Sequence, residues 1–211
     1  MWCLMDDVIE NVLSEYEQRA EKEDTVIAEL YSRQQMLQRR DEFLLSVGRH
    51  TATLLNILAR DSEAKRILEI GTSYGYSTIW LADAARATGG RVTTLEVQPN
   101  KVAHAKSQVA RAGLSSFVDF RIGDARESLA ALDGPFDFVL LDLWKDLYIP
   151  CFDLAYPKLA PGAIIVADNM LAPAVTIDEA NRYREHVRRH RDIDTVLLPV
   201  GSGIEVSRKS S

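Results

Sequence analysis

The stretch that decides the fold spans residues 66–77 and reads RILEIGTSYGYS. Its first half is a short apolar strand that ends in a glycine turn at Gly71, and Gly75 opens a helix that continues through Ala84. A strand, a glycine turn and a helix N-terminus in this order present backbone N–H groups to a nucleotide-like ligand at the edge of an open α/β sheet. Glycine suits the turn because a Cβ would obstruct either the turn itself or the approach of the ligand.

The spacing of the two glycines argues against a dinucleotide. A dinucleotide site reads G-x-G-x-x-G, and its middle glycine makes room for the pyrophosphate. This chain reads GTSYG from Gly71 to Gly75, with no middle glycine. Glu69, two residues before the turn, would oppose a pyrophosphate but could pair with an ammonium or sulfonium group. Glu96 ends the next strand, where ribose hydroxyls are usually bound. Because this second acid is in register with the glycine turn, a turn that only connects a strand to a helix is the weaker interpretation.

The pattern of apolar segments predicts a Rossmann-like, doubly wound α/β fold. The strands are almost continuously apolar, as in a parallel sheet covered on both faces. We expect a mostly parallel seven-stranded sheet whose strands cover residues 66–70, 91–96, 118–122, 136–142, 163–168, 194–199 and 204–208. The last two strands form an antiparallel hairpin around a Gly-Ser-Gly turn. The expected helices are one or two amphipathic helices within residues 8–40, one at 41–59 interrupted by Gly48, and others at 77–87, 101–112, 126–132 and 150–159.

Oxygen donors gather where the later strands end. Asp142 follows the fourth predicted strand, and Asp168 and Asn169 follow the fifth. Because the carboxyl ends of parallel strands share one edge of the sheet, these side chains should meet there. They form the ligand set of a hard cation such as Mg²⁺, although a single Asp at a strand end is usually a helix cap. From this chemistry alone both interpretations stay open.

The glycine turn and two further motifs, at residues 141–150 and 166–169, resemble one known family. The glycine turn is similar to the first motif, E/D-x-G-x-x-x-G, of the class I S-adenosylmethionine-dependent methyltransferases. Residues 141–150 read LDLWKDLYIP and resemble the catechol O-methyltransferase pattern L-D-x-W-K-D-x-Y, which precedes a strand that ends in A-D-N. Residues 166–169 read VADN and match that ending. The resemblance runs from about residue 44 to residue 209, and both motifs match with their spacing.

The resemblance implies a role for each matching position. Val47 would offer backbone contacts to the methionine end of the cofactor, Glu96 would hold the ribose, and Trp144 would pack beside the adenine. The implied cofactor-binding residues are Val47, Glu69, Gly71, Thr72, Ser73, Gly75, Ser77, Glu96, Asp124, Ala125, Asp142 and Trp144. Asp142, Asp168 and Asn169 would bind a divalent cation, Mg²⁺ or Mn²⁺. Lys145 would be the general base.

The chemistry of a catechol agrees with these roles. A catechol hydroxyl is mostly protonated at neutral pH and is then a poor nucleophile. A divalent cation lowers the pKa of an oxygen bound to it. Lys145 must act while it is neutral, so we expect burial and the metal to depress its pKa. The alternative for Lys145 is a surface lysine that pairs with Asp146.

The chain departs from the family pattern in two respects, and its histidines add no further motif. An acidic residue from a late loop, which touches the second substrate hydroxyl in the family, has no clear match after Asn169. Leu143 replaces a residue that is often more polar. The histidines show neither a catalytic triad nor a metal spacing and are interpreted as surface or packing residues; they are His50, His104, His186 and His190.

Length and charge restrict the possible partners. The 211 residues fit a helical extension or cap at residues 1–60 and an S-adenosylmethionine-binding catalytic domain at residues 61–211. The net charge of −6 argues against broad binding to nucleic acid or anionic lipid. A candidate basic patch consists of Arg182, Arg184, Arg188, Arg189 and Arg191. Such a run is more typical of a solvated helix face than of a binding site.

Neither the cysteines nor the N-terminus indicates an exported protein. Cys3 and Cys151 lie far apart and suggest neither a disulfide framework nor a cysteine-rich metal site. The N-terminus lacks a basic region and becomes acidic at Asp6, so no signal peptide is expected. No apolar segment is long enough to span a bilayer. We therefore expect a cytoplasmic protein without a membrane partner.

The resemblance implies a metal-dependent O-methyltransferase that acts on a small catechol-like or phenolic acceptor. One alternative keeps the fold and cofactor but changes the acceptor to a hydroxylated uridine of tRNA, an alternative that the arginine run supports and the net charge opposes. A second alternative is a binding module without catalysis, which would have no need of Lys145 and the metal ligands. The apolar stripe between Val8 and Tyr31 predicts a homodimer whose N-terminal helices cross to the partner, or else helices that fold back on their own sheet.

Overall fold

The computed structural model describes residues 5–210, apart from the side chains of Leu37 and Arg40. Cys3 and the start of the predicted N-terminal region lie outside this range, and Cys151 is a buried free thiol. The strands are β1 (Arg66–Ile70), β2 (Arg91–Glu96), β3 (Val118–Ile122), β4 (Phe136–Leu141), β5 (Leu159–Ala167), β6 (Ile193–Leu198) and β7 (Ile204–Lys209). They form one seven-stranded sheet in the order β3-β2-β1-β4-β5-β7-β6. Strands β1 to β5 are parallel and β7 is antiparallel to both β5 and β6, so the predicted fold class is confirmed.

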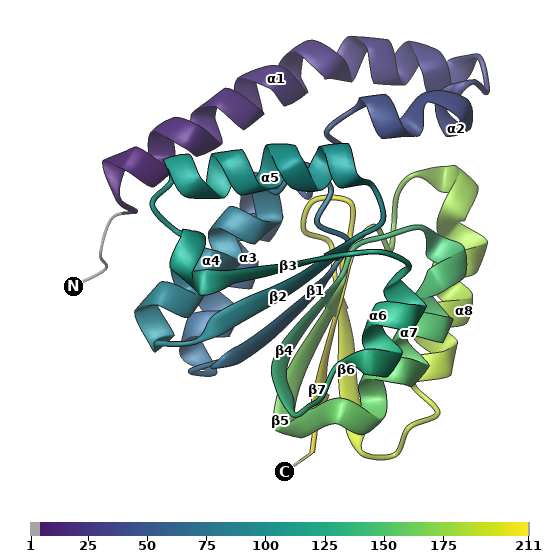
Figure 1. The fold of residues 1–211 in the computed structure, drawn as a ribbon. Coiled ribbons are helices and arrows are strands. Elements are labelled where there is room, and N and C mark those ends of the chain that lie inside the picture. Colours follow the sequence, from purple (N-terminus) through teal and green to yellow (C-terminus); the bar gives the residue numbers. More distant parts are fainter. Residues whose placement is uncertain (1–4, 211) are drawn as a thin grey trace.

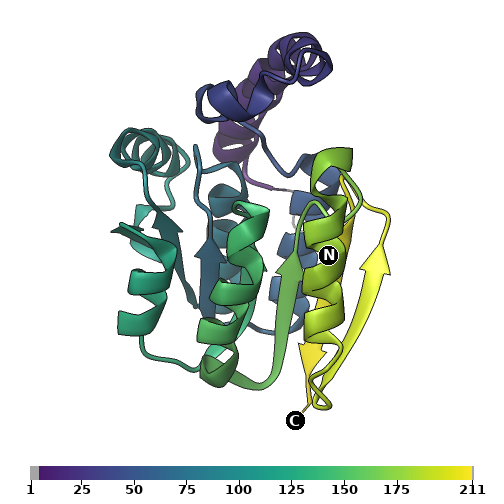
Figure 2. The same ribbon diagram turned by 90° about the vertical axis from the view of Figure 1, so that its right-hand side faces the viewer.

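Helices cover both faces of the sheet (Figure 1). They are α1 (Asp7–Ser32), α2 (Met36–Arg39), α3 (Arg49–Asp61), α4 (Tyr76–Thr88), α5 (Pro99–Arg111), α6 (Ala125–Ala131), α7 (Tyr148–Ala155) and α8 (Ile177–Val187). Figure 2 shows α6, α7 and α8 side by side over one face, and α3 and α4 lie behind the sheet in this view. Within residues 5–210, no helix combines the length and apolar character that a membrane span requires.

The strands divide their side chains between two cores because successive residues of a strand point to opposite faces. In β1, Ile67 belongs to the core under α3 and α4, whereas Leu68 belongs to the core under α7 and α8. In β4, Phe138 and Val139 divide in the same way. Central strands that are buried on both faces therefore read as unbroken apolar runs, which is why the sequence pattern locates them.

Several elements differ from the prediction, among them α7, which covers Tyr148–Ala155 and not residues 150–159. Strand β5 begins at Leu159, four residues before the predicted start at 163, because its first part pairs across a register shift with β4. No helix was predicted with residue bounds where α8 lies. The arginine run that begins in α8 was only interpreted as a helix face. The predicted helix at residues 41–59 starts only after Gly48, which has a φ of +78°.

The N-terminal half of α1 packs on its own chain. Ile9, Val12, Leu13 and Tyr16 are buried in the same core as residues of α3 and α4. The Tyr16 hydroxyl donates a hydrogen bond to the backbone oxygen of Tyr74, 2.5 Å away, which ties α1 to the turn between β1 and α4. In this half of the helix, the apolar stripe therefore folds back on its own chain, which was the alternative to crossing to a partner. The division of the chain at residue 60 and the homodimer stay predictions.

Candidate active site

The glycine turn after β1 is required by the packing of the protein itself. Gly71 has a φ of +111°, and a Cβ at this position would lie 1.8 Å from the backbone oxygen of Asp142. Gly75 has a φ of +96°, and its Cβ would lie 2.7 Å from the Cβ of Ala105 in α5. Both positions therefore exclude any side chain, because the backbone conformation and a close neighbour act together. The turn brings β1 and the end of β4 into contact.

Glu69 is fully buried beneath this turn and holds it together. One carboxylate oxygen accepts a hydrogen bond from the Ser77 hydroxyl, and the other accepts from the Thr78 and Thr94 hydroxyls, each at 2.6 Å. Burial raises the pKa of Glu69 to about 7, and the three hydroxyls oppose this rise. The acid thus connects β1, β2 and the first turn of α4 through hydroxyl groups of the protein.

Glu96 occupies the end of β2 beside the same turn. One of its carboxylate oxygens accepts the backbone N–H of Ser73 at 2.8 Å, and the other accepts the backbone N–H of Gln98 at 3.0 Å. Ser73 has a φ of +46°, in the left-handed region that non-glycine residues seldom adopt. The carboxylate therefore holds a strained backbone in place. Since an ionised carboxylate offers about four acceptor positions, two remain for other partners.

A cleft lies over the turn and collects much of the predicted cofactor site. Among the predicted residues, it is lined by Val47, Gly71, Thr72, Ser73, Gly75, Ser77 and Asp142. Leu44, Leu45 and Ser46 complete one wall, from the segment just before α3. Leu45 has a φ of +44° and Gly48 a φ of +78°, so this segment is bent sharply where it passes the turn. The structure thus brings residues 44–47, among them Val47, and the first glycine turn together.

The remaining predicted cofactor residues lie outside the lining of this cleft. The side chain of Asp124 caps α6 by accepting the backbone N–H of Arg126 at 2.8 Å. Hydrogen bonds from the Arg126 side chain and backbone lower the pKa of Asp124 to about 2. Ala125 is the first residue of α6, and Trp144 precedes the short 3₁₀ turn Lys145–Leu147. Asp124 is therefore a helix cap, whatever it also contributes to a ligand.

The predicted metal residues meet at the ends of β4 and β5. The backbone N–H of Asp168 bonds to Leu141 O at 3.1 Å, and that of Asp142 bonds to Ile70 O at 2.9 Å, so the strand ends lie in register. Burial raises the pKa of both Asp142 and Asp168, and the charge of Asp142 raises the pKa of Asp168 further. Asn169 follows with a φ of +55°.

Asp168 carries an unsatisfied oxygen at this place. Its Oδ1 is buried and finds no hydrogen-bond partner among residues 5–210. A buried polar atom without a partner costs free energy, and a charged one costs more. A cation would satisfy this oxygen, and the carboxylates of Asp142 and Asp168 with the amide of Asn169 suit Mg²⁺ or Mn²⁺. The residues present at this edge of the sheet therefore fit a divalent cation.

Lys145 points to the same edge. Its Nζ donates a hydrogen bond to the backbone oxygen of Asp168 at 2.8 Å and lies 3.6 Å from the centre of the Tyr148 ring. The Tyr148 hydroxyl donates to the same backbone oxygen at 3.1 Å. Burial lowers the pKa of Lys145 to about 8, against the opposing charges of Asp142 and Asp168. This placement favours a proton acceptor over a surface lysine paired with Asp146.

Three residues that shape the site were not singled out from the sequence. Thr78 and Thr94 hold Glu69, and Tyr148 shares the Asp168 backbone oxygen with Lys145. Tyr148 stands in the motif that indicated the family, so its position was a usable signal. Nothing in the local pattern distinguishes Thr94, because its partner lies on the neighbouring strand.

The arginine run is largely engaged with acidic residues. Arg182 pairs with Glu179 at 3.0 Å. Arg184 and Arg188 both pair with the buried Glu205, at 2.9 and 3.0 Å. These guanidinium groups support α8 and β7, which agrees with the interpretation of the run as a helix face.

Comparisons with known proteins identify the family. A family model described as O-methyltransferase matches residues 17–210, so the chain belongs to this family. The chain is 41% identical over 167 residues to a catechol O-methyltransferase of Niastella koreensis, covering 73% of this chain and 75% of that protein. It is 39% identical over 128 residues to a catechol O-methyltransferase of Mycobacterium tuberculosis, covering 60% of this chain and 58% of the relative.

Solved structures agree in fold. An O-methyltransferase from Bacillus cereus, solved in complex with SAH, matches with a TM-score of 0.75 and 26% identity over 100% of this chain and 94% of that one. The O-methyltransferase TomG from Streptomyces achromogenes, solved in complex with SAM, matches with a TM-score of 0.73 and 28% identity over 93% of this chain and 99% of that one. The predicted class I methyltransferase fold is confirmed.

Proposed function

We propose that this protein transfers a methyl group from S-adenosylmethionine to a hydroxyl of a small catechol-like or phenolic acceptor, with the help of a divalent cation. Relatives named catechol O-methyltransferase support the acceptor class, and the complexes of related enzymes with SAH and SAM support the cofactor. The observation that carries the proposal is the unsatisfied Oδ1 of Asp168 beside the amine of Lys145.

The cofactor would lie over the glycine turn. Val47 and its bent segment would contact the methionine part, and Glu96 would bind the ribose through its remaining acceptor positions. Asp124, Ala125 and Trp144 would border the adenine from the ends of β3 and β4. Glu69 would act indirectly, because its oxygens already accept three hydroxyl groups of the protein.

Asp142, Asp168 and Asn169 would hold Mg²⁺ or Mn²⁺. When it is bound, the cation supplies positive charge that lowers the pKa of an acceptor hydroxyl. The two carboxylates lie in an environment that disfavours their charged forms, as the raised pKa of each shows. An acceptor positioned here would place its hydroxyl near Lys145.

Lys145 in its neutral form would accept the hydroxyl proton at Nζ. The oxygen would then donate an electron pair to the methyl carbon and form the O–C bond. The S–C bond breaks, and its electron pair remains on sulfur, which becomes a neutral thioether. Because the sulfonium activates the methyl group itself, the main work of the protein is to hold the oxygen, carbon and sulfur in line.

The test is a methyl-transfer assay with purified protein, S-adenosylmethionine and catechol. We expect monomethylated catechol and SAH in the presence of Mg²⁺, loss of product in excess EDTA, and recovery with Mg²⁺ or Mn²⁺. Full turnover in excess EDTA would overturn the role of the cation. Cofactor binding without transfer to any catechol or phenol would overturn the acceptor class but leave the cofactor site standing.

We also propose a homodimer. Val8 and Val26 on α1 remain 51% and 41% exposed, so the inner face of α1 does not use all the apolar residues of the stripe. A two-fold pair is the commonest soluble assembly and would cover such residues. Light scattering should give twice the mass of the chain at micromolar concentration. A monomer would overturn this proposal, and Val26→Asp should favour the monomer if α1 lies at the interface.

A further inference from the structure

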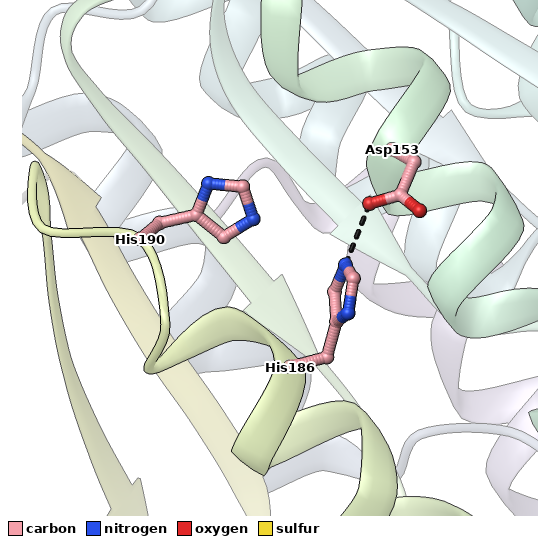
Figure 3. A group of neighbouring side chains, drawn as sticks. All are labelled: Asp153, His186 and His190. Atoms are coloured by element: carbon pink, nitrogen blue, oxygen red, sulfur yellow. Dashed lines mark hydrogen bonds and ion pairs between the residues drawn. The ribbon is translucent and has the colours of Figure 1, made fainter.

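Asp153, His186 and His190 form a cluster on the outer side of α7 and α8 (Figure 3). Their potential ligand atoms all lie within 4.8 Å of one another. The Nε2 of His186 is 2.6 Å from a carboxylate oxygen of Asp153, and the two imidazole rings have centres 5.7 Å apart. Asp153 is exposed and both histidines are half-buried. Within residues 5–210, this is the cluster of His, Cys, Asp and Glu side chains that meets the distance requirement for a shared metal ion.

The end of α8 places the two histidines on one face. They are four residues apart, and α8 ends at Val187, but the chain continues the turn with a hydrogen bond from the His190 N–H to Val187 O at 3.1 Å. Residues four apart on a helix are neighbours on its surface. Two histidines at this spacing on a helical face are a recurrent way to bind zinc. The interpretation of these two histidines from the sequence as surface or packing residues therefore missed a pair that the turn after α8 brings together.

Aromatic packing fixes both rings. The His190 ring lies 4.3 Å from the ring centre of Tyr156 and 5.3 Å from that of Phe152. The His186 ring lies 5.9 Å from Phe152 at a right angle. Because the rings are held by neighbours, little side-chain freedom remains to be lost when a ligand binds. The cluster is therefore organised before any ion arrives.

We propose that Asp153, His186 and His190 bind a transition-metal ion, of which Zn²⁺ is the natural probe. Two imidazole nitrogens and one carboxylate oxygen suit Zn²⁺, Co²⁺ or Ni²⁺ and not Mg²⁺. The ion takes the place of the hydrogen bond between His186 and Asp153; a proton on Nε2 moves to Nδ1 or is released to solvent, and water fills the open coordination position. Ligand atoms around tetrahedral zinc are about 3.4 Å apart. His186 and Asp153 at 2.6 Å would therefore move apart slightly, and the separations of up to 4.8 Å in the cluster would shorten.

None of the three residues belongs to the predicted catalytic edge, so an ion here would serve the fold. Helix α7 starts at the carboxyl end of β4 and runs toward the opposite end of the sheet, where β6 begins just after His190. An ion at Asp153 therefore joins α7 to the end of α8 on the side away from the glycine turn. Binding to the folded state alone raises stability in proportion to the free ion concentration.

Calorimetry with Zn²⁺, in buffer with excess Mg²⁺ to occupy the oxygen site, tests the proposal. We expect one Zn²⁺ per chain and a rise in Tm of about 5–10 °C when free Zn²⁺ exceeds its Kd about 100-fold. His190→Phe keeps the aromatic packing but removes a ligand, and His186→Ala removes another. Each should weaken Zn²⁺ binding by more than about 100-fold, since even residues behind the ligands cost 10–100-fold.

Matched controls separate this site from others. His50→Ala removes an exposed histidine elsewhere, and Asp146→Asn removes an exposed carboxylate near α7; both should bind Zn²⁺ as the wild type does. Substitution of Co²⁺ should give visible absorption bands that His190→Phe abolishes. Wild-type protein that takes up no Zn²⁺, or His190→Phe and His186→Ala proteins that bind it unchanged, would overturn the proposal.

Discussion

Two buried acids at the same edge of the sheet differ in how the protein treats them. Glu69, at the end of β1, gives its two oxygens to three hydroxyl groups. Asp168, after the end of β5, has a buried Oδ1 that no described residue satisfies. A buried carboxylate that the protein satisfies belongs to the fold, whereas one that it leaves unsatisfied indicates a missing partner.

The charges around the two acids sharpen the difference. Burial is the main cause of the raised pKa of each acid, and the charge of Asp142 adds to the rise at both. The rise is opposed by three hydroxyl groups at Glu69, but by the Asn169 backbone N–H and the charge of Lys145 at Asp168. Two carboxylates and a lysine with a lowered pKa meet at the β4 and β5 ends. Opposed pKa shifts in one cleft are typical of catalytic groups. The β1 side therefore holds the turn, and the β4–β5 side is where we expect the chemistry.

The largest effect is expected at Lys145. Lys145→Ala should reduce the methyl-transfer rate by about 10²–10⁴, the usual range for one acid–base group. The affinity for SAH, measured by calorimetry, should barely change because the cleft is lined by residues 44–47, residues 71–77 and Asp142, and not by Lys145. Lys145→Arg should not restore the rate, since a guanidinium does not give up its proton.

The pH profile gives a second measurement at Lys145. Its pKa is lowered to about 8, so the neutral amine that accepts the proton becomes more abundant as the pH rises through this value. The wild-type rate should therefore rise with pH and level off at or below about pH 8, because a bound cation lowers the pKa of Lys145 further, and the rise should vanish in Lys145→Ala. An alanine variant with most of its turnover would show that the lysine is not the base.

The next effect separates function from stability at Asp168. Asp168→Asn should weaken Mn²⁺ binding, followed by electron paramagnetic resonance, by more than about 100-fold, because a charged ligand is lost. Without metal, its Tm should equal or exceed that of the wild type, since the substitution removes a buried charge beside Asp142. Asp146→Asn is the matched control and should change neither quantity. A large drop in Tm with intact Mn²⁺ binding would make Asp168 a structural residue.

Much of this comparison could be predicted from the sequence. The apolar runs and their ends located the strands, and the acids that follow the strands had to meet at one edge because parallel strands all end there. The motif around Trp144 and Lys145 marked the functional edge. Helix α8 was not given bounds from the sequence, although its inward residues, Ala180, Tyr183 and Val187, follow helical spacing between charged residues.

The distinction between the satisfied and the unsatisfied acid could not be predicted. Both appear in the sequence as an acid near the end of an apolar strand. Thr94, which bonds to Glu69, lies 25 residues away on β2, so only the register of β1 and β2 shows the contact. The pairing of Asp153 with His186 likewise depends on how α7 packs on α8. Contacts of this kind arise from tertiary packing, which local patterns do not encode.

At Glu69 we expect a pH-dependent effect on stability. The unfolded chain releases this proton near pH 4.5, whereas the folded protein retains it until about pH 7. Between these values the folded state binds more protons, so the contribution of Glu69 to stability falls as the pH rises. The loss should approach about 3 kcal/mol above pH 7. Glu69→Gln resembles the protonated acid and should remove this dependence.

Chemical denaturation of ligand-free protein at several pH values measures the effect. The relevant quantity is the difference in unfolding free energy between wild type and Glu69→Gln, because Asp142 and Asp168 also contribute to the pH dependence of each protein alone. The unfolding free energy of Glu69→Gln should increase relative to that of the wild type as the pH rises from 5 to 8. A difference that stays constant over this range would show that Glu69 is ionised throughout in the folded protein.

The smallest effect is expected at Glu96, whose carboxylate is satisfied less fully than that of Glu69 and more fully than that of Asp168. Its oxygens accept the N–H groups of Ser73 and Gln98, yet the side chain is only half-buried and keeps acceptor positions for a ribose. Glu96→Ala should weaken SAH binding by about 1–3 kcal/mol, the cost of unpaired polar partners. Glu96→Gln still offers an oxygen to Ser73 and should keep the strained turn. The loss of SAH affinity in this variant therefore measures the ribose contact alone. Unchanged affinity in both variants would mean that Glu96, like Glu69, serves only the turn.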